Sequence, residues 1–221
     1  MRSAVVFLGP SLDRREALAI LPADYRPPAA RGDITRAVSD GARVIGLIDG
    51  VFFQESSVGH REILGALKKG VRVVGASSMG ALRAAELHTL GMEGVGEVYR
   101  MYRDGVIVSD DEVALAFDPE AFTALSEPLV NIRATLARAE EEGVIDHGTR
   151  DNLFSAASSL YYPARTYPRL VREAKGSVDP GALARFAGWV EKGAVDLKRR
   201  DAVEALGRIR EILSEKGREQ E

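Results

Sequence analysis

The stretch RVVGASSMGALR, residues 72–83, has the pattern of a buried strand that turns abruptly into a helix. Two serines stand at the corner, and small residues, Ala76 and Gly80, flank Ser78 at two-residue offsets. A nucleophile elbow has this form, because a sharp turn needs small neighbours and exposes a hydroxyl above the sheet. The plainer interpretation is that Ser77 or Ser78 only caps the helix, which is the commonest role of serine there.

The alternation of strand and helix extends outward from this stretch over the first 90 residues. Short apolar runs are followed by helix-like segments, which predicts βαβ units and a parallel sheet. Ser11 is expected to cap the first helix, and Asp33 is expected to cap the second. The expected strands are residues 4–8, 25–28, 43–48 and 71–75, and the expected helices are residues 14–21, 34–40, 57–69 and 81–90.

Beyond residue 92 the pattern becomes mostly helical. The sequence therefore predicts an α/β fold in which an N-terminal parallel sheet with flanking helices, Rossmann or flavodoxin-like, precedes a mostly helical C-terminal half. A boundary is expected at Gly176-Ser177, which separates a core domain of residues 1–175 from a C-terminal helical extension of residues 176–221. The later helices are expected at residues 95–103, 129–142, 149–160, 167–174, 180–192 and 196–216.

The composition argues against nucleic-acid and membrane partners. Charged residues make up 29% of the 221 residues with a net charge of −3, and this balance lacks the basic face that nucleic acid requires. No apolar run approaches the roughly 20 residues that span a bilayer. We therefore expect a cytoplasmic protein without nucleic-acid or membrane partners.

The sequence contains no cysteine, which excludes a thiolate nucleophile, a persulfide or a thiolate metal site on this chain. Imidazole chemistry has three candidates, His60, His88 and His147. His88 lies near the far end of its helix and is expected on the edge of the sheet opposite to His60. His147 follows Asp146 at a turn, where it is expected to help begin a helix.

The loops that follow the strands of a parallel sheet open on one carboxyl edge, where ligands bind. Gly9, Ser11, Asp49 and Ser78 all lie in such loops, and His60 lies near the start of the helix after Asp49. Of the three histidines, only His60 is therefore expected to reach Ser78.

Several of these side chains have two possible roles. Asp49 could orient His60 or position substrate, and it could equally cap its own loop. Arg83 could hold an anion in the site or pair locally with Glu86 three residues on. The residues expected to line the substrate site are Ser77, Arg83, Ser11 and Gly9.

The acidic triplet Asp110-Asp111-Glu112 invites a magnesium interpretation. Three adjacent acids outside a strand end are more often a solvated turn or a cap, and no glycine-rich stretch matches a phosphate-binding fingerprint. We therefore expect neither a metal nor a cofactor.

Several separated blocks of the sequence together resemble the TfuA-like proteins, and the resemblance covers roughly residues 4–165. Such a series is far more specific than any one motif. The blocks are GPSL (9–12), YRPPAARGD (25–33), IDGVF (48–52), HREI (60–63), GASSMGALRAAE (75–86), DDEVA (110–114) and PLVNIRATL (128–136).

The resemblance implies a role beside a YcaO enzyme in peptide backbone thioamidation. TfuA-like proteins are associated with trifolitoxin-type and other ribosomal peptides, and with thioglycine in methyl-coenzyme M reductase. The family is thought to release sulfide from a thiocarboxylated ThiS-like carrier protein and to hand it to YcaO. The peptide or protein substrate would be met through YcaO, which activates the amide with ATP, so this chain would need no nucleotide.

Hydrolysis of a thiocarboxylate is acyl transfer, which needs a nucleophile, a base and donors for an oxyanion. The leading hypothesis assigns these roles to Ser78 as nucleophile, His60 as general base, Asp49 as its orienter and the helix-start amides as donors. The other hypothesis is a non-catalytic partner that binds and activates YcaO or docks the carrier, with the serines serving only as caps.

Overall fold

The computed structural model describes residues 4–52 and 56–218, without the side chains of residues 216–218. In this part of the chain, five strands form one parallel sheet in the order β2-β1-β3-β4-β5. The expected parallel sheet with flanking helices and a helical C-terminal half is therefore confirmed. The strands are β1 (Ala4–Phe7), β2 (Asp24–Arg26), β3 (Val44–Leu47), β4 (Arg72–Gly75) and β5 (Glu93–Gly94).

The helices of the sheet region begin close to the expected positions, but two caps differ. The first helix is capped by Asp13, whose carboxylate accepts the N–H groups of Arg15 and Glu16, and not by Ser11. The second helix follows Gly32, and Asp33 is its first residue. The helices are α1 (Arg14–Ile20), α2 (Asp33–Ser39), α3 (His60–Lys68), α4 (Met79–Leu87), α5 (Glu97–Arg103) and, near the C-terminus, α10 (Leu197–Arg218).

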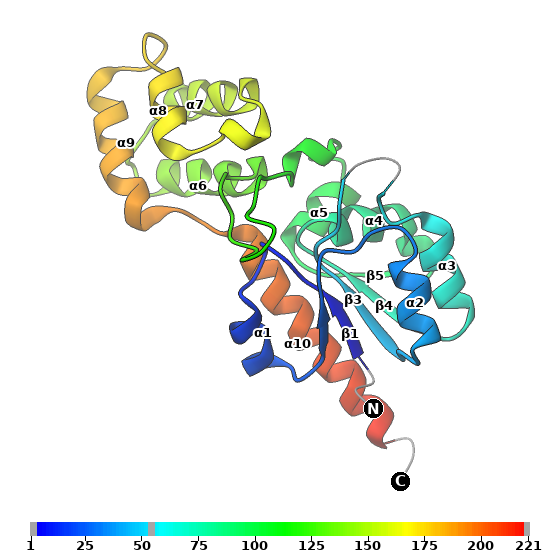
Figure 1. Ribbon diagram of the computed structural model, residues 1–221. Helices are drawn as coiled ribbons and strands as arrows, with labels where there is room; N and C mark the ends of the chain where they lie inside the picture. The colour runs from blue at the N-terminus through cyan, green and yellow to red at the C-terminus, as the bar shows by residue number, and fades with distance from the viewer. Residues whose placement is uncertain (1–3, 53–55, 219–221) are drawn as a thin grey trace. The chain divides into compact units, whose positions relative to one another are not determined.

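The two faces of the sheet are covered by different helices (Figure 1). Successive side chains of a strand point to opposite faces, so alternate residues of β1, β3 and β4 divide between two apolar layers. Val6, Val44 and Val74 belong to the layer that also contains residues of α1 and α10. Helices α2, α3 and α4 lie over the opposite face (Figure 1). Both faces are therefore buried, as parallel strands require.

Helix α10 completes the first of these layers. Its apolar stripe packs into the same core as β1 and β3 and consists of Ala202, Ala205, Leu206, Ile209 and Ile212. Gly46, in the middle of β3, makes room for the helix, because a Cβ there would lie 2.7 Å from Ile209 Cδ1. The apolar stripe of α10 therefore packs against the sheet.

The chain forms two compact units, and each is described separately. Unit 1 contains residues 1–110 and 198–221, and unit 2 contains residues 111–197. The boundary that the sequence predicts, between residues 175 and 176, falls inside unit 2. Helix α10, the last of the chain, belongs almost entirely to unit 1, because its apolar stripe covers one face of the sheet.

Unit 2 is helical and has an apolar core of its own, which includes Leu136, Leu153, Leu170 and Phe186. Carboxylate and hydroxyl caps begin its later helices: Asp146 accepts the N–H of Thr149, for example. No helix in the described ranges of either unit has the length and apolar character needed to cross a membrane. The helices of unit 2 are α6 (Leu129–Glu141), α7 (His147–Ser159), α8 (Tyr167–Glu173) and α9 (Pro180–Gly193).

Candidate functional site

The candidate site lies at the point where the order of the strands reverses. Strand β1 has β2 on one side and β3 on the other, so the loops after β1 and β3 lead to opposite faces of the sheet. In doubly wound sheets, ligands bind in the crevice at such a switch point. The residues expected from the sequence, Gly9, Ser11, Asp49 and Ser77, lie in the loops around this point.

Asp49 joins the β3 loop to the β1 loop. Its Oδ2 accepts the backbone N–H groups of Gly9 (2.8 Å) and Ser11 (3.1 Å), and its Oδ1 accepts the hydroxyl of Ser11 (2.6 Å). The main chain of Asp49 is fixed as well, because its carbonyl accepts the N–H of Ala29 (2.9 Å). Asp49 is 2% exposed. The carboxylate therefore caps the neighbouring β1 loop, and Ser11 serves this contact rather than capping α1.

Ser77 and Ser78 stand at the corner between β4 and α4 in different conformations. Ser77 has a φ of +67°, in the left-handed region that is costly for a side chain other than glycine. Its hydroxyl donates to Ser11 Oγ (2.9 Å). Ser78 is the residue before α4, and its side chain makes no capping hydrogen bond. The strained position of this corner is therefore Ser77, one residue before Ser78, which the sequence pattern places at the centre of the turn.

The corner is tight because glycines line its inner side. A Cβ on Gly80 would collide with the carbonyl oxygen of Leu47 on the neighbouring strand. The sharp turn therefore needs a small residue at position 80, because two backbone segments approach closely there. The backbone N–H of Ser78 donates to Ala76 O (2.7 Å), and that of Gly80 donates to Ile48 O (3.3 Å). The start of α4 places the positive end of its helix dipole at this corner. The amides of Ser78 and Gly80 already donate to backbone carbonyls there.

Lys198, in the first turn of α10, extends this group of buried polar side chains. Its Nζ lies 4.0 Å from Asp49 Oδ1, and the side chains of Lys198 and Asp49 are each 3% exposed. The sequence patterns do not single out Lys198, although it stands four residues before Ala202 on the buried stripe of α10. That spacing is the signal that could have found it. Ser11, Asp49, Ser77 and Lys198 are called the Asp49 cluster below.

His60 belongs to a second group. It is the first residue of α3, and its Nε2 lies 2.8 Å from Glu86 Oε2 on α4. Arg83 donates to the same oxygen (2.7 Å) and, through Nε, to the carbonyl of Val58 (2.9 Å). The His60 side chain is 48% exposed. Among the described residues, the hydrogen bonds thus join His60 to Glu86 rather than to Asp49, and Arg83 makes the local pair. His60, Arg83 and Glu86 are called the His60 cluster.

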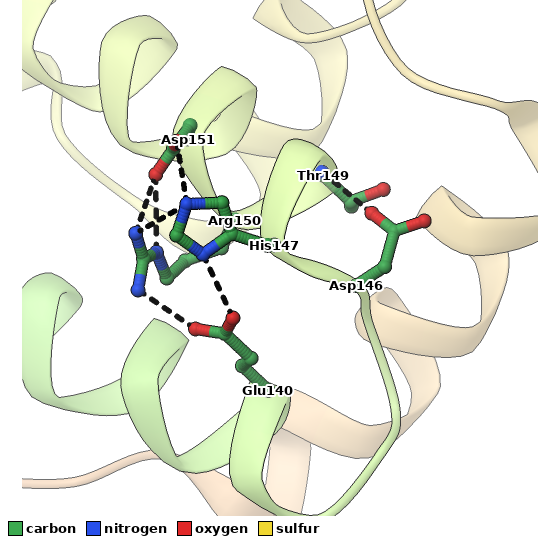
Figure 2. Close-up of polar contacts among 6 residues, drawn as sticks. All are labelled: Glu140, Asp146, His147, Thr149, Arg150 and Asp151. Atoms are coloured by element: carbon green, nitrogen blue, oxygen red, sulfur yellow. Dashed lines mark hydrogen bonds and ion pairs between the residues drawn. The ribbon is translucent and has the colours of Figure 1, made fainter.

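The other two histidines have different hydrogen-bond partners. His88 donates through Nδ1 to the carbonyl of Ala85 (2.9 Å). Figure 2 shows His147 as the first residue of α7, where its Nδ1 lies 3.0 Å from Glu140 Oε1 and Arg150 donates to the other oxygen of Glu140 (2.8 Å). The expectation that His147 helps to begin a helix is confirmed.

Two carboxylates of the acidic triplet form ion pairs with arginines inside unit 2. Asp111 pairs with the buried Arg165, and Glu112 Oε1 accepts from Arg133 Nη2 (2.6 Å). Within residues 4–52 and 56–218, no group of three or more histidine, aspartate or glutamate side chains is arranged to hold a metal ion. Asp111 and Glu112 therefore join helical segments of unit 2.

Another buried carboxylate, Asp201, lies on α10 and also accepts backbone amides. Asp201 is 2% exposed and accepts the backbone N–H groups of Glu97 (2.9 Å) and Val98 (2.7 Å) at the start of α5. Burial raises its pKa to about 6 although the two amides lower it. Asp201 therefore caps α5 as Asp49 caps the β1 loop.

The sheet order and the polar side chains at its switch point define a flavodoxin-like α/β protein with a serine and carboxylate site at its carboxyl edge. The family model for TfuA-like proteins matches residues 49–166, which is more than half of the chain, and the protein therefore belongs to the TfuA-like family. No curated protein matches the chain significantly. Membership of this family supports a role as a YcaO-associated accessory protein in thioamidation.

Proposed function

We propose that this protein hydrolyses the thiocarboxylate of a ThiS-like carrier protein and releases sulfide for a YcaO enzyme. In the overall reaction, the carrier thiocarboxylate and one water molecule give the carrier carboxylate and hydrogen sulfide. No oxidant or reductant is consumed. The YcaO enzyme would then use the sulfide to convert a backbone amide of its peptide or protein substrate into a thioamide.

The observation that carries this proposal is the hydrogen-bonded chain from Ser77 through Ser11 to Asp49. A serine nucleophile needs a group that accepts its proton, and a carboxylate reached through a second hydroxyl supplies one. Backbone strain concentrates at functional sites, and the described residue at this corner with a positive φ is Ser77. The position at the switch point adds support, because that edge is where ligands of such sheets bind.

In the proposed reaction, Ser77 Oγ attacks the thiocarboxylate carbon. Its proton passes to Ser11 Oγ while the proton of Ser11 passes to Asp49 Oδ1. The carbon–sulfur bond then breaks, and Asp49 returns the proton by way of Ser11 to the departing sulfide. A water molecule hydrolyses the acyl ester on Ser77, which restores the serine hydroxyl and releases the carrier carboxylate.

Ser78 and His60 form the alternative assignment of nucleophile and base. The hydroxyl of Ser78 is not used for capping, and His60 is supported by the Glu86 carboxylate, which could hold its ring in place. Both assignments describe the same acyl transfer. They differ in which serine carries the acyl group and in whether the proton goes to a carboxylate or to an imidazole.

The test is to incubate the purified full-length protein with thiocarboxylated carrier and to measure sulfide without YcaO, without ATP and with a chelator present. Ser77→Ala should lower the rate roughly 1,000-fold or more, whereas Ser78→Ala should lower it less than about 10-fold. Circular dichroism checks that both variants fold. Reversed losses would assign the nucleophile to Ser78, and no release by the wild-type protein would overturn the proposal.

Burial of the serines favours a second candidate function, that of a non-catalytic partner that activates YcaO or docks the carrier. Ser77 is 0% exposed and Ser78 is 2% exposed, so neither hydroxyl offers surface to a substrate in this conformation. Hydrolysis requires local opening of the corner, whereas a docking role requires none. Thioamidation by YcaO supplied with free sulfide separates the two, because only an activator would still accelerate that reaction.

A further inference from the structure

A pocket in unit 1 lies between α5 and α10, beside the last strand of the sheet. Its volume of about 390 Å³ is within the range of ligand-binding pockets. Gly94 and Tyr99 line it on the side of β5 and α5, and Gly207 and Arg208 line it on the side of α10. Its lining contains none of the residues of the Asp49 cluster or the His60 cluster. This pocket is called the β5 groove below.

Strand β5 offers main-chain groups to the β5 groove. Val95 donates its N–H to the carbonyl of Gly75 on β4 (2.9 Å). Because the main-chain groups of successive residues in a strand point to opposite sides, the N–H and C=O of Gly94 point away from β4. In the described sheet, β5 is the last strand in the order, so no further strand pairs with these two groups. They are the groups that an added strand would use.

Gly207 is a glycine in the interior of α10 that packing within the described chain does not require. Helix interiors disfavour glycine, because it loses more backbone freedom than any other residue. A Cβ on Gly207 would meet no described atom within 4 Å, whereas a Cβ on Gly46 would crowd Ile209. A larger side chain at position 207 would instead extend into the β5 groove, which Gly207 lines. The glycine therefore keeps the groove open.

The charges of the β5 groove favour a polypeptide main chain over a free anion. Three arginines line it, and each already pairs with a carboxylate: Arg100 with Glu97, Arg103 with Asp104 and Arg208 with Glu93. A site for a free anion needs guanidinium groups whose charge is not already compensated. A main chain is neutral and carries a donor and an acceptor at each residue, which matches the N–H and C=O of Gly94.

We propose that the β5 groove binds the extended C-terminal tail of the carrier protein as an added strand and directs its thiocarboxylate to the corner that holds Ser77. This inference rests on the proposed function, in which the reacting group ends a polypeptide. Ser77 stands two residues after Gly75, the residue of β4 that receives the Val95 N–H. An added strand would lie about 10 Å from β4, and about three extended residues beyond β5 cover that distance.

The first experiment measures, by titration calorimetry, how the full-length protein binds the carrier in its carboxylate form, which cannot release sulfide. Gly207→Leu should weaken binding at least about 10-fold, because the new side chain occupies the groove. Its unfolding midpoint should not fall, since leucine favours a helix more than glycine does. Gly188→Leu on α9 is the matched control: a Cβ there also meets no described atom within 4 Å, and Gly188 does not line the groove. Equal affinities of the two variants would overturn the inference.

The second experiment uses the wild-type protein, so it does not depend on the folding of a variant. Hydrogen exchange of the Gly94 amide is followed by NMR with and without a synthetic peptide of the carrier tail that ends in a carboxylate. Exchange should slow at least about 10-fold with the peptide bound, because the Gly94 N–H then donates to the peptide main chain. Absence of binding, binding that leaves Gly94 unprotected, or protection by inorganic phosphate instead would overturn the inference.

Steady-state kinetics separate this inference from the proposed function. In Gly207→Leu, the KM of sulfide release should rise at least about 10-fold while kcat changes less than about 3-fold, because the groove holds the tail and takes no part in the bond changes. Sulfide release with an unchanged KM would overturn the inference and leave the proposed function standing. Protection of Gly94 by the tail in a protein that releases no sulfide would refute the proposed function alone.

Discussion

The Asp49 cluster and the His60 cluster differ in their exposure to solvent. Each contains a carboxylate and a cationic or ionisable nitrogen within 4.0 Å. Asp49 and Lys198 are almost fully buried, whereas the His60 and Glu86 side chains are 48% and 37% exposed. Water and salt screen the second pair but have little access to the first.

This difference decides how each cluster should respond to mutation. An exposed ion pair contributes about 0–1 kcal/mol, because solvent already satisfies both groups. Removing one member of a buried pair leaves the charge of the other out of the reach of water. The sequence suggested that one triad would unite the two clusters. The structure separates them, so each can be broken without the other.

Asp49→Ala should have the largest effect. The change leaves the amides of Gly9 and Ser11, the Ser11 hydroxyl and the Lys198 ammonium without their carboxylate, and we expect a loss of about 3–5 kcal/mol in the free energy of unfolding. Urea denaturation measures it. Glu86→Ala, which removes a partly exposed carboxylate, is the control and should cost about 1 kcal/mol or less. Equal losses in the two variants would contradict the comparison.

Asp201 sharpens the comparison, because it is a buried carboxylate whose pKa is raised to about 6 by burial. The folded protein therefore holds a proton on Asp201 at pH values where the unfolded chain, with a pKa near 3.8, has lost it. This contribution to stability is complete below about pH 4 and is lost as the pH rises through about 6.

Asp201→Asn, which cannot titrate, should therefore gain stability relative to the wild-type protein by about 2 kcal/mol as the pH rises from about 4.5 to about 7. Denaturant unfolding of both proteins at the two pH values measures the gain. Parallel changes in the two proteins would show that Asp201 keeps its charge in the fold. Glu204→Gln, on the same helix, checks the smaller contribution of that neighbouring charge, which also raises the pKa of Asp201.

Much of the fold could be predicted because its signals are local. Apolar runs followed by helix-like segments predicted β1, β3 and β4 and the helices after them, and the helical pattern of residues 196–216 predicted α10. Strand β5 was not predicted, because its two residues, Glu93–Gly94, carry no apolar run. The destination of α10 could not be predicted either, since an apolar stripe does not reveal which surface it covers.

The candidate site shows the same limit. The sequence placed Asp49, Ser11 and Ser77 at one edge, because parallel strands bring their loops together. It could not assign their partners, since a hydrogen bond depends on side-chain directions within a few tenths of an ångström. Asp49 was expected to meet His60, and the loop amides of Gly9 and Ser11 meet it instead. Lys198 comes from a helix about 150 residues away in sequence, and its place on the apolar stripe of α10 does not reveal that it lies beside Asp49.

The smallest effect is expected for His60→Ala. His60 begins α3 on the surface, and the exposed contact with Glu86 should contribute less than about 1 kcal/mol to the free energy of unfolding. If Asp49 receives the proton of the nucleophile, the rate of sulfide release should also fall less than about 10-fold. Glu86→Gln serves as the matched variant, since it removes the charge beside His60 and Arg83 but keeps the shape. A fall of roughly 1,000-fold in His60→Ala, with unfolding unchanged, would move the base from the buried cluster to the exposed one. The proton would then leave through the His60 imidazole, and Ser78 rather than Ser77 would be its natural source.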